Sequence, residues 1–233
     1  MSSFLSLSYA EKKSPDEFSV KYIDERILQT PAIALAQLIK EMSYMLEVAQ
    51  RALDKAMDNF INRTEDEEPV RKDLREINFL SGKVTDYLIR LSEEDMSHND
   101  ELTVSSLYKV LSDIMRVADF SNNIMRYLRV AVANELYFSS EGLNEIKEMY
   151  SLVDELFKDV DYTFANRTTR LLAKIEDTES KTDKFKLQLQ QNHLDRLKGG
   201  NCKSESSSLY VNLIGNIERV ADHLVYIAQS VKE

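Results

Sequence analysis

Ile114-Met-Arg-Val-Ala-Asp119 recurs as Ile217-Glu-Arg-Val-Ala-Asp222, and this pair of hexapeptides indicates an internal duplication. The two copies lie 103 residues apart and are identical at five of six positions. Further upstream, at an offset of 106 residues, Arg90-Leu91 matches Arg196-Leu197. A repeat of roughly 100 residues is too long for one unit of a solenoid, so it predicts two homologous halves.

The spacing of apolar residues is typical of α-helices along most of the chain. Only 5 Gly and 3 Pro interrupt the 233 residues, and apolar side chains recur with a period of about 3.6. Thr30-Pro31 is typical of a helix start, and Gly199-Gly200 is typical of a helix stop. We predict six helices: over about 31–62, over about 70–93, from about 99 to 139, from 140 onward, through 171–198, and along the C-terminal residues up to 231.

These elements predict an all-α fold of two tandem three-helix bundles. The duplication divides the chain into a first bundle at 31–136 and a second bundle at 140–233, with residues 1–30 as a linker or N-terminal extension. Apolar residues in the last helix alternate in steps of four and three, which is the spacing of a bundle seam. Such seams permit a homodimer without requiring one.

Composition and charge exclude several classes of protein. The chain has 30 Lys+Arg against 40 Asp+Glu, a net charge of −10, so we expect no nucleic-acid partner, since phosphate binding needs clustered basic residues. No apolar run reaches the 18 or so residues of a membrane span. The first residues lack the features of a secretion signal, and a single cysteine, Cys202, cannot form an internal disulfide. We therefore expect a cytoplasmic protein.

The best candidate site is the acid pair of the second hexapeptide. Glu218 and Asp222 are four residues apart, so both carboxylates project from one face of a helix. Their oxygens suit a divalent or trivalent metal, with iron, manganese, zinc and magnesium as candidates. The alternative is a solvated helix flank in which Arg219 and Arg116 form surface ion pairs.

The first hexapeptide departs from this pattern at one position. Met115 stands where Glu218 stands in the second copy, and a thioether cannot replace a carboxylate as a ligand of a hard cation. Asp119 matches Asp222 and is the third candidate metal ligand, with Asp113 or Glu76 as partners from neighbouring turns. We expect this first site to be weaker than the second, or empty.

Catalytic motifs are lacking in the sequence. There is no Gly-rich phosphate loop and no Gly-x-Ser-x-Gly elbow. A di-iron carboxylate enzyme would need Glu-x-x-His, and none of His98, His193 and His223 has a glutamate three residues before it. We therefore predict that the protein is not an enzyme, and a carboxylate metalloenzyme is the third and weakest reading.

The sequence resembles the PhoU family of phosphate-uptake regulators. The resemblance depends on the duplicated Ile-x-Arg-Val-Ala-Asp helix, on Glu218-x-x-x-Asp222, and on His193-Leu-Asp-Arg-Leu197 with the Gly/Asn/Cys loop that follows. The segment Tyr22-Ile-Asp-Glu-Arg-Ile-Leu-Gln-Thr-Pro-Ala-Ile-Ala-Leu35 is similar to the segment that leads into the PhoU-like C-terminal cytoplasmic domain of bacterial sodium/phosphate cotransporters. The similarity covers about residues 20–233.

The resemblance implies two three-helix bundles, in agreement with the duplication. It also implies a regulator tied to phosphate transport at the inner face of the cell membrane, and metal binding through Glu218, Asp222 and Asp119. Our first hypothesis is the cytoplasmic tail of a sodium/phosphate cotransporter. Its partners would be the membrane domain of the transporter or phosphate-signalling proteins.

Our second hypothesis is a stand-alone metal-binding adaptor that negatively regulates phosphate-starvation signalling. It differs from the first hypothesis in its partner and not in its fold. An in-frame hydrophobic segment upstream would decide between the two.

Overall fold

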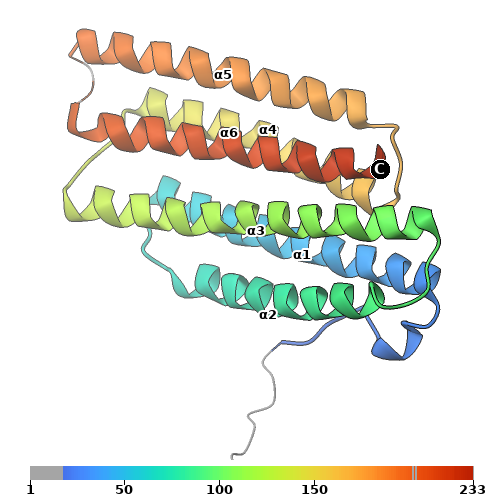
Figure 1. The fold of residues 1–233 in the computed structure, drawn as a ribbon. Coiled ribbons are helices and arrows are strands. Elements are labelled where there is room, and N and C mark those ends of the chain that lie inside the picture. Colours follow the sequence, from blue (N-terminus) through green and yellow to red (C-terminus); the bar gives the residue numbers. More distant parts are fainter. Residues whose placement is uncertain (1–17, 201, 203, 233) are drawn as a thin grey trace, which may run out of the picture.

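The chain folds into six long helices and three short ones, as the computed structural model of residues 18–200, 202 and 204–232 shows (Figure 1). No strand occurs in this part of the chain, so the prediction of an all-α fold is confirmed. The long helices are α1 (Pro31–Asn62), α2 (Glu68–Leu91), α3 (His98–Ala133), α4 (Ser140–Ala165), α5 (Leu172–Lys198) and α6 (Ser207–Gln229). The short 3₁₀ helices are η1 (Glu25–Ile27), η2 (Ser204–Ser206) and η3 (Ser230–Lys232).

One helix boundary differs clearly from the prediction. α3 ends at Ala133 rather than near 139, and Glu135 follows in the left-handed region with φ 51°. Ser139, not Ser140, then caps α4, since its Oγ accepts a hydrogen bond from the Gly142 N–H at 3.1 Å. Apolar periodicity could not show where the backbone leaves the helix, because the boundary depends on these local bonds.

Two three-helix bundles pack side by side, which confirms the predicted tandem duplication. We call α1–α3 the first bundle and α4–α6 the second bundle. Their contact is made by α3 against α6 and by α1 against α4 (Figure 1). Fully buried side chains such as Leu38 and Ile114 in the first bundle, and Phe157 and Leu213 in the second, belong to one continuous apolar cluster. Burial of this cluster is the main favourable contribution to folding.

A second repeated motif marks the ends of α1 and α4. Phe60-Ile-Asn-Arg-Thr64 matches Phe164-Ala-Asn-Arg-Thr168 at an offset of 104 residues. Both arginines are left-handed, with φ 54° at Arg63 and 46° at Arg167. Arg63 donates to the Leu136 carbonyl at 2.6 Å, and Arg167 donates to the Ser230 carbonyl at 3.3 Å. Each arginine thus fixes the chain near the end of the third helix of its own bundle.

Residues 18–30, which we expected to belong to a linker, are packed against the first bundle. Leu28 is buried, and Asp24 caps η1 by accepting from the Arg26 N–H at 3.0 Å. Thr30 precedes α1 as expected but makes no side-chain capping bond. The rest of the predicted linker, residues 1–17, lies outside the described residues.

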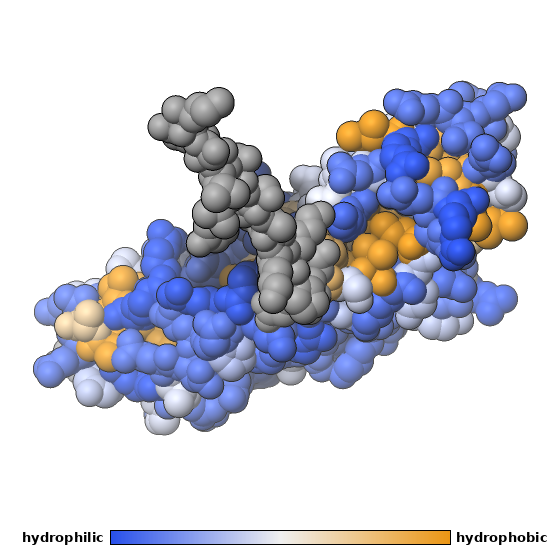
Figure 2. Space-filling view, turned by 90° about the horizontal axis from the view of Figure 1, so that it is seen from below, coloured by the Kyte–Doolittle hydropathy of each residue, from blue (hydrophilic) through white to orange (hydrophobic). Residues whose placement is uncertain are grey.

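The surface offers no large apolar face in the view of Figure 2. That face is mostly hydrophilic, and its hydrophobic residues gather in small separate patches toward the two ends. Among the described residues, none of the helices combines the length and the apolar character that crossing a membrane requires.

Candidate metal centre

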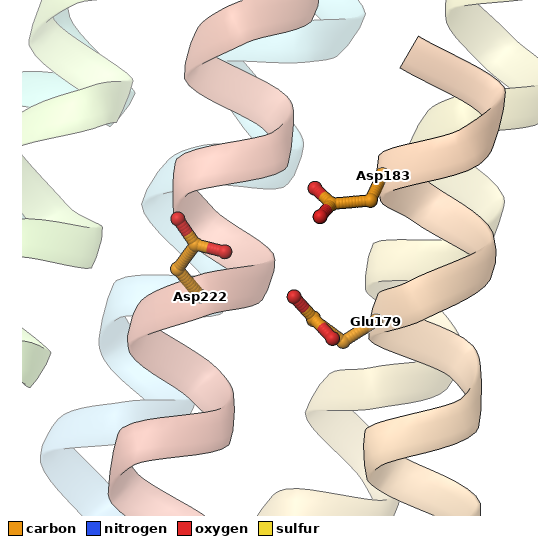
Figure 3. Close-up of side chains that lie close together, drawn as sticks. All are labelled: Glu179, Asp183 and Asp222. Atoms are coloured by element: carbon orange, nitrogen blue, oxygen red, sulfur yellow. The ribbon is translucent and has the colours of Figure 1, made fainter. Parts of the chain in front are cut away.

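Three carboxylates meet between α5 and α6 of the second bundle. Glu179 and Asp183 come from α5, and Asp222 comes from α6 (Figure 3). One oxygen of each lies within 4.8 Å of the other two. The side chains of Glu179 and Asp183 extend from α5 toward α6, which carries Asp222 (Figure 3). This arrangement places the predicted ligand Asp222 beside two acids that were not predicted as ligands.

The positions of the three acids follow from helical periodicity. Glu179 and Asp183 are four residues apart, so they lie one above the other on α5. The buried side chains of Thr178 and Thr182 precede them by one residue on the same helix. The two acids therefore flank the core-facing side of α5 at the edge that faces α6, where Asp222 is half-buried.

Burial and mutual repulsion disfavour the charged forms of two of these acids. Burial, followed by the charges of Glu218 and Asp183, raises the pKa of Asp222. Burial, followed by the charges of Asp183 and Asp222, raises the pKa of Glu179. A bound cation would remove this repulsion and favour the ionised carboxylates. In the described part of the chain, no lysine or arginine forms an ion pair with Glu179, Asp183 or Asp222.

Glu218, the other predicted ligand on α6, has a counter-ion of its own. Lys186 Nζ on α5 lies 2.7 Å from Glu218 Oε1, and both side chains are mostly buried. Glu218 therefore borders the three-carboxylate cluster without being part of it. A metal ion that recruited Glu218 would have to displace Lys186.

Asp119, predicted as the ligand of the first bundle, lies apart from any such cluster. Its side chain is 65% exposed, and its ion pair is with Arg116 on the same helix at 3.6 Å. The partners that we considered for it are engaged elsewhere: Asp113 accepts from His223 Nδ1 at 2.8 Å, and Glu76 lies 2.8 Å from an Arg51 nitrogen. No metal-binding group of three ligands forms among the described residues of this bundle.

Glu179 and Asp183 were not predicted as ligands, although the sequence contains a signal for them. Glu179-x-x-x-Asp183 has the same spacing as Glu218-x-x-x-Asp222. Acid pairs at this spacing are common on exposed helix faces, so the spacing alone carried little weight. A comparison of α5 with α6 for matching acid pairs would have selected it.

The cluster offers oxygen ligands only. Carboxylate oxygens suit hard cations such as Mg²⁺, Ca²⁺ and Mn²⁺, whereas zinc sites more often include sulfur or nitrogen. The nearest histidine in sequence, His223, forms its hydrogen bond with Asp113 on α3. The donor set therefore suits hard cations such as magnesium, calcium and manganese better than zinc.

Comparison with known proteins places this pair of bundles in a family. The PhoU domain matches the chain twice, over residues 42–128 and 146–231. The chain belongs to the PhoU family. Each match lies within one bundle, so each three-helix bundle is one PhoU repeat.

Relatives of this PhoU chain fall into two kinds. It is 24% identical over 225 residues to the "Putative inorganic phosphate export protein YjbB" of Escherichia coli K12, and 22% identical over 222 residues to the protein of that name from Salmonella typhimurium. Each alignment covers 91% of this chain but 40% of the relative. It is also 24% identical over 205 residues to "Phosphate-specific transport system accessory protein PhoU homolog 1" of Thermotoga maritima, covering 84% of this chain and 85% of the relative.

Proposed function

We propose that this PhoU chain is a non-catalytic regulatory module of phosphate homeostasis. The observation that carries the proposal is the double match to the PhoU domain, one match in each bundle. The names of both kinds of relative refer to phosphate export or phosphate transport. A helical scaffold with an acid cluster, and without a recognisable catalytic motif in the sequence, suits regulation through protein contacts.

Within this role, we propose that the chain acts as the cytoplasmic tail of a sodium/phosphate cotransporter at the inner face of the cell membrane. It spans 40% of the length of the export proteins that it matches, so in them the PhoU repeats are joined to a larger remainder. The partner would then be a membrane domain that carries phosphate.

The alternative is a stand-alone PhoU adaptor that negatively regulates phosphate-starvation signalling. The Thermotoga accessory protein supports it, since the alignment covers 85% of that relative. Its partners would be phosphate-signalling proteins in place of a covalently joined transporter.

One experiment separates these functions. Radiolabelled phosphate flux and a phosphate-starvation reporter are measured in cells of the source organism that lack the gene, with sodium or with choline in the medium. The cotransporter tail predicts a change in sodium-dependent flux, and the adaptor predicts a derepressed reporter with sodium-dependent flux intact. The same measurements are repeated after the gene is returned on a plasmid. If neither the phosphate flux nor the reporter signal differs between cells with and without the gene, the proposed role in phosphate homeostasis is wrong.

We further propose that the acid cluster of the second bundle binds a metal ion. Glu179, Asp183 and Asp222 would supply the ligands, Glu218 would join them if Lys186 moved away, and Asp119 would contribute only a weak separate site. The support is the convergence of three carboxylate oxygens within 4.8 Å without a lysine or arginine partner in the described residues. Bound metal would neutralise the cluster and could hold α5 against α6.

Elemental analysis of the purified protein tests this site. Wild-type protein, a Glu218→Ala/Asp222→Ala variant and an Asp119→Ala variant are each purified from cells grown with iron, manganese, zinc and magnesium. We expect metal in the wild type and in Asp119→Ala, and little in the double variant. Equal and negligible metal in all three would contradict the proposal.

A further inference from the structure

A buried glutamate on α1 holds the chain segment that precedes this helix. Glu41 has no solvent-exposed surface, and its carboxylate accepts hydrogen bonds from three successive backbone N–H groups. The Lys21 N–H lies 2.9 Å and the Tyr22 N–H 2.6 Å from Oε2, and the Ile23 N–H lies 3.2 Å from the same oxygen. We call residues 18–27 the strap.

Side chains hold the strap in the same position. Lys21 Nζ lies 3.2 Å from the centroid of the Tyr44 ring on α1, which is a cation–π contact. On α2, the Tyr87 hydroxyl donates to the Asp24 carbonyl at 3.2 Å, and an Arg90 nitrogen lies 2.6 Å from Glu25 Oε2. The strap is therefore fixed to two helices of the first bundle.

The equivalent glutamate of the second bundle has hydrogen-bond donors that Glu41 does not have. By the offset of 104 residues that relates α1 to α4, Glu41 corresponds to Glu145. Glu145 is satisfied by side chains of its own bundle: Arg196 at 2.7 and 2.9 Å, the Tyr210 hydroxyl at 2.6 Å and Asn192 at 2.8 Å.

The counterparts of these donors in the first bundle cannot serve Glu41. Leu107 stands at the position of Tyr210 and has no hydroxyl. Arg90 stands at the position of Arg196, but it pairs with Glu25 of the strap. Within residues 18–200, 202 and 204–232, the hydrogen bonds to the Glu41 carboxylate come from the strap. Without the strap, Glu41 would be a buried carboxylate with no donor, which is strongly unfavourable.

We propose that the strap is a latched conformational element and that Glu41 is its latch. In the latched state, three backbone N–H groups satisfy the buried carboxylate with hydrogen bonds, so the strap and the first bundle move as one body. Release of the strap requires that another hydrogen-bond donor reach the Glu41 carboxylate. The Tyr44 hydroxyl donates a hydrogen bond to the Glu76 carboxylate on α2, which forms an ion pair with Arg51 on α1. A displacement of the strap is thereby transmitted to α1 and, through Tyr44, to this ion pair between α1 and α2.

Amide hydrogen exchange, followed residue by residue by NMR, tests the latch. In Glu41→Gln, the side-chain amide presents N–H groups where the carboxylate accepted hydrogen bonds. We expect exchange at Lys21, Tyr22 and Ile23 to accelerate by roughly ten- to a hundredfold, since charge-assisted bonds are lost. Protection in α5 should stay at the wild-type value.

Two matched variants serve as controls. Glu47→Gln changes an exposed glutamate on the same helix, and Glu145→Gln changes the equivalent buried glutamate of the second bundle. Neither should accelerate exchange in the strap. If Glu41→Gln leaves the strap amides as protected as these controls do, the latch is wrong.

A variant in the strap itself keeps the test decisive if Glu41→Gln loses protection throughout the protein. Tyr22→Pro removes the N–H that makes the shortest bond to Glu41 and leaves the α1 sequence unchanged. We expect faster exchange at Lys21 and Ile23 and faster trypsin cleavage after Arg26, with the α1 amides still protected. Unchanged exchange and cleavage would overturn the proposal.

Discussion

Equivalent carboxylates in the two bundles differ in whether they have a cationic partner. In the first bundle, buried Asp73 on α2 accepts from Arg51 Nε at 3.0 Å and from Lys55 Nζ at 2.6 Å, both on α1. Its equivalent in the second bundle, at an offset of 106 residues, is Glu179, which has no such partner in the described chain and faces Asp222. One carboxylate is therefore neutralised within the protein, while the other remains available to an external cation.

The difference arises on the neighbouring helix. At the positions on α4 that match Arg51 and Lys55, the chain carries Glu155 and Asp159. These acids bind Lys174 on α5 at 2.9 and 2.7 Å. The charges between the first two helices are thus inverted between the bundles. The duplicated scaffold keeps its apolar seam, whereas the charged residues beside the seam differ between the two copies.

The largest expected effect is on stability in the first bundle. Arg51→Met/Lys55→Met would leave Asp73 buried without a cation, so we expect the free energy of unfolding to fall by about 2–3 kcal/mol, discounted because both cations are partly exposed. Urea denaturation measures this loss. Adding Asp73→Asn should recover a substantial part of it, and an unchanged midpoint in the double variant would contradict a structural role for these ion pairs.

The next effect concerns metal affinity in the second bundle. Glu179→Gln/Asp183→Asn removes two of the three clustered carboxylates, so we expect Mn²⁺ affinity to fall by about tenfold or more, or roughly 1.4 kcal/mol. Isothermal titration calorimetry gives the dissociation constants. Asp73→Asn serves as the matched change in the first bundle and should leave Mn²⁺ affinity as in the wild type. Equal affinity in all three proteins would exclude α5 as a source of ligands.

A smaller effect, a gain in the free energy of unfolding, is expected when Glu179 is changed in metal-free protein. The raised pKa of Glu179 means that its charged form destabilises the fold above that pKa, and this destabilisation disappears as the pH falls through it. Glu179→Gln should therefore raise the free energy of unfolding at pH 7 by about 0.5 kcal/mol. The gain should vanish below the ordinary glutamate pKa of 4.5. Chelator-treated protein, melted at several pH values, tests both signs, and a loss of stability at pH 7 would contradict the repulsion.

The smallest effect is expected where the sequence is made more symmetrical. Met115→Glu restores Glu-x-x-x-Asp in the first bundle, yet we expect no additional bound metal, since Asp73 remains paired with Arg51 and Lys55. The measurement is metal stoichiometry by elemental analysis, with wild-type protein alongside. A second equivalent of metal in the variant would show that Met115 alone disables the first site.

The fold was predictable from the sequence to within a few residues at most helix ends. The α1 bounds agree with the prediction, whereas α3 ends at Ala133 because the turn at Glu135 depends on backbone conformation. For the candidate site, the sequence indicated Asp222, but it also indicated Asp119, which lies exposed beside Arg116. The metal-ligand role of Glu218, Asp222 and Asp119 stays a prediction. The arrangement of Glu179 and Asp183 beside Asp222 was not foreseen.

The helices, the duplication and the family could all be inferred from the sequence, because apolar periodicity and repeated motifs are properties of positions along the chain. Which charged groups meet depends instead on how the helices pack. Glu179 and Asp222 are separated by 43 positions in the sequence. Glu41 accepts hydrogen bonds from backbone N–H groups, which a pattern of side chains does not reveal. Burial and the distance between opposite charges set the energy of a carboxylate, and both quantities exist only once the helices have packed.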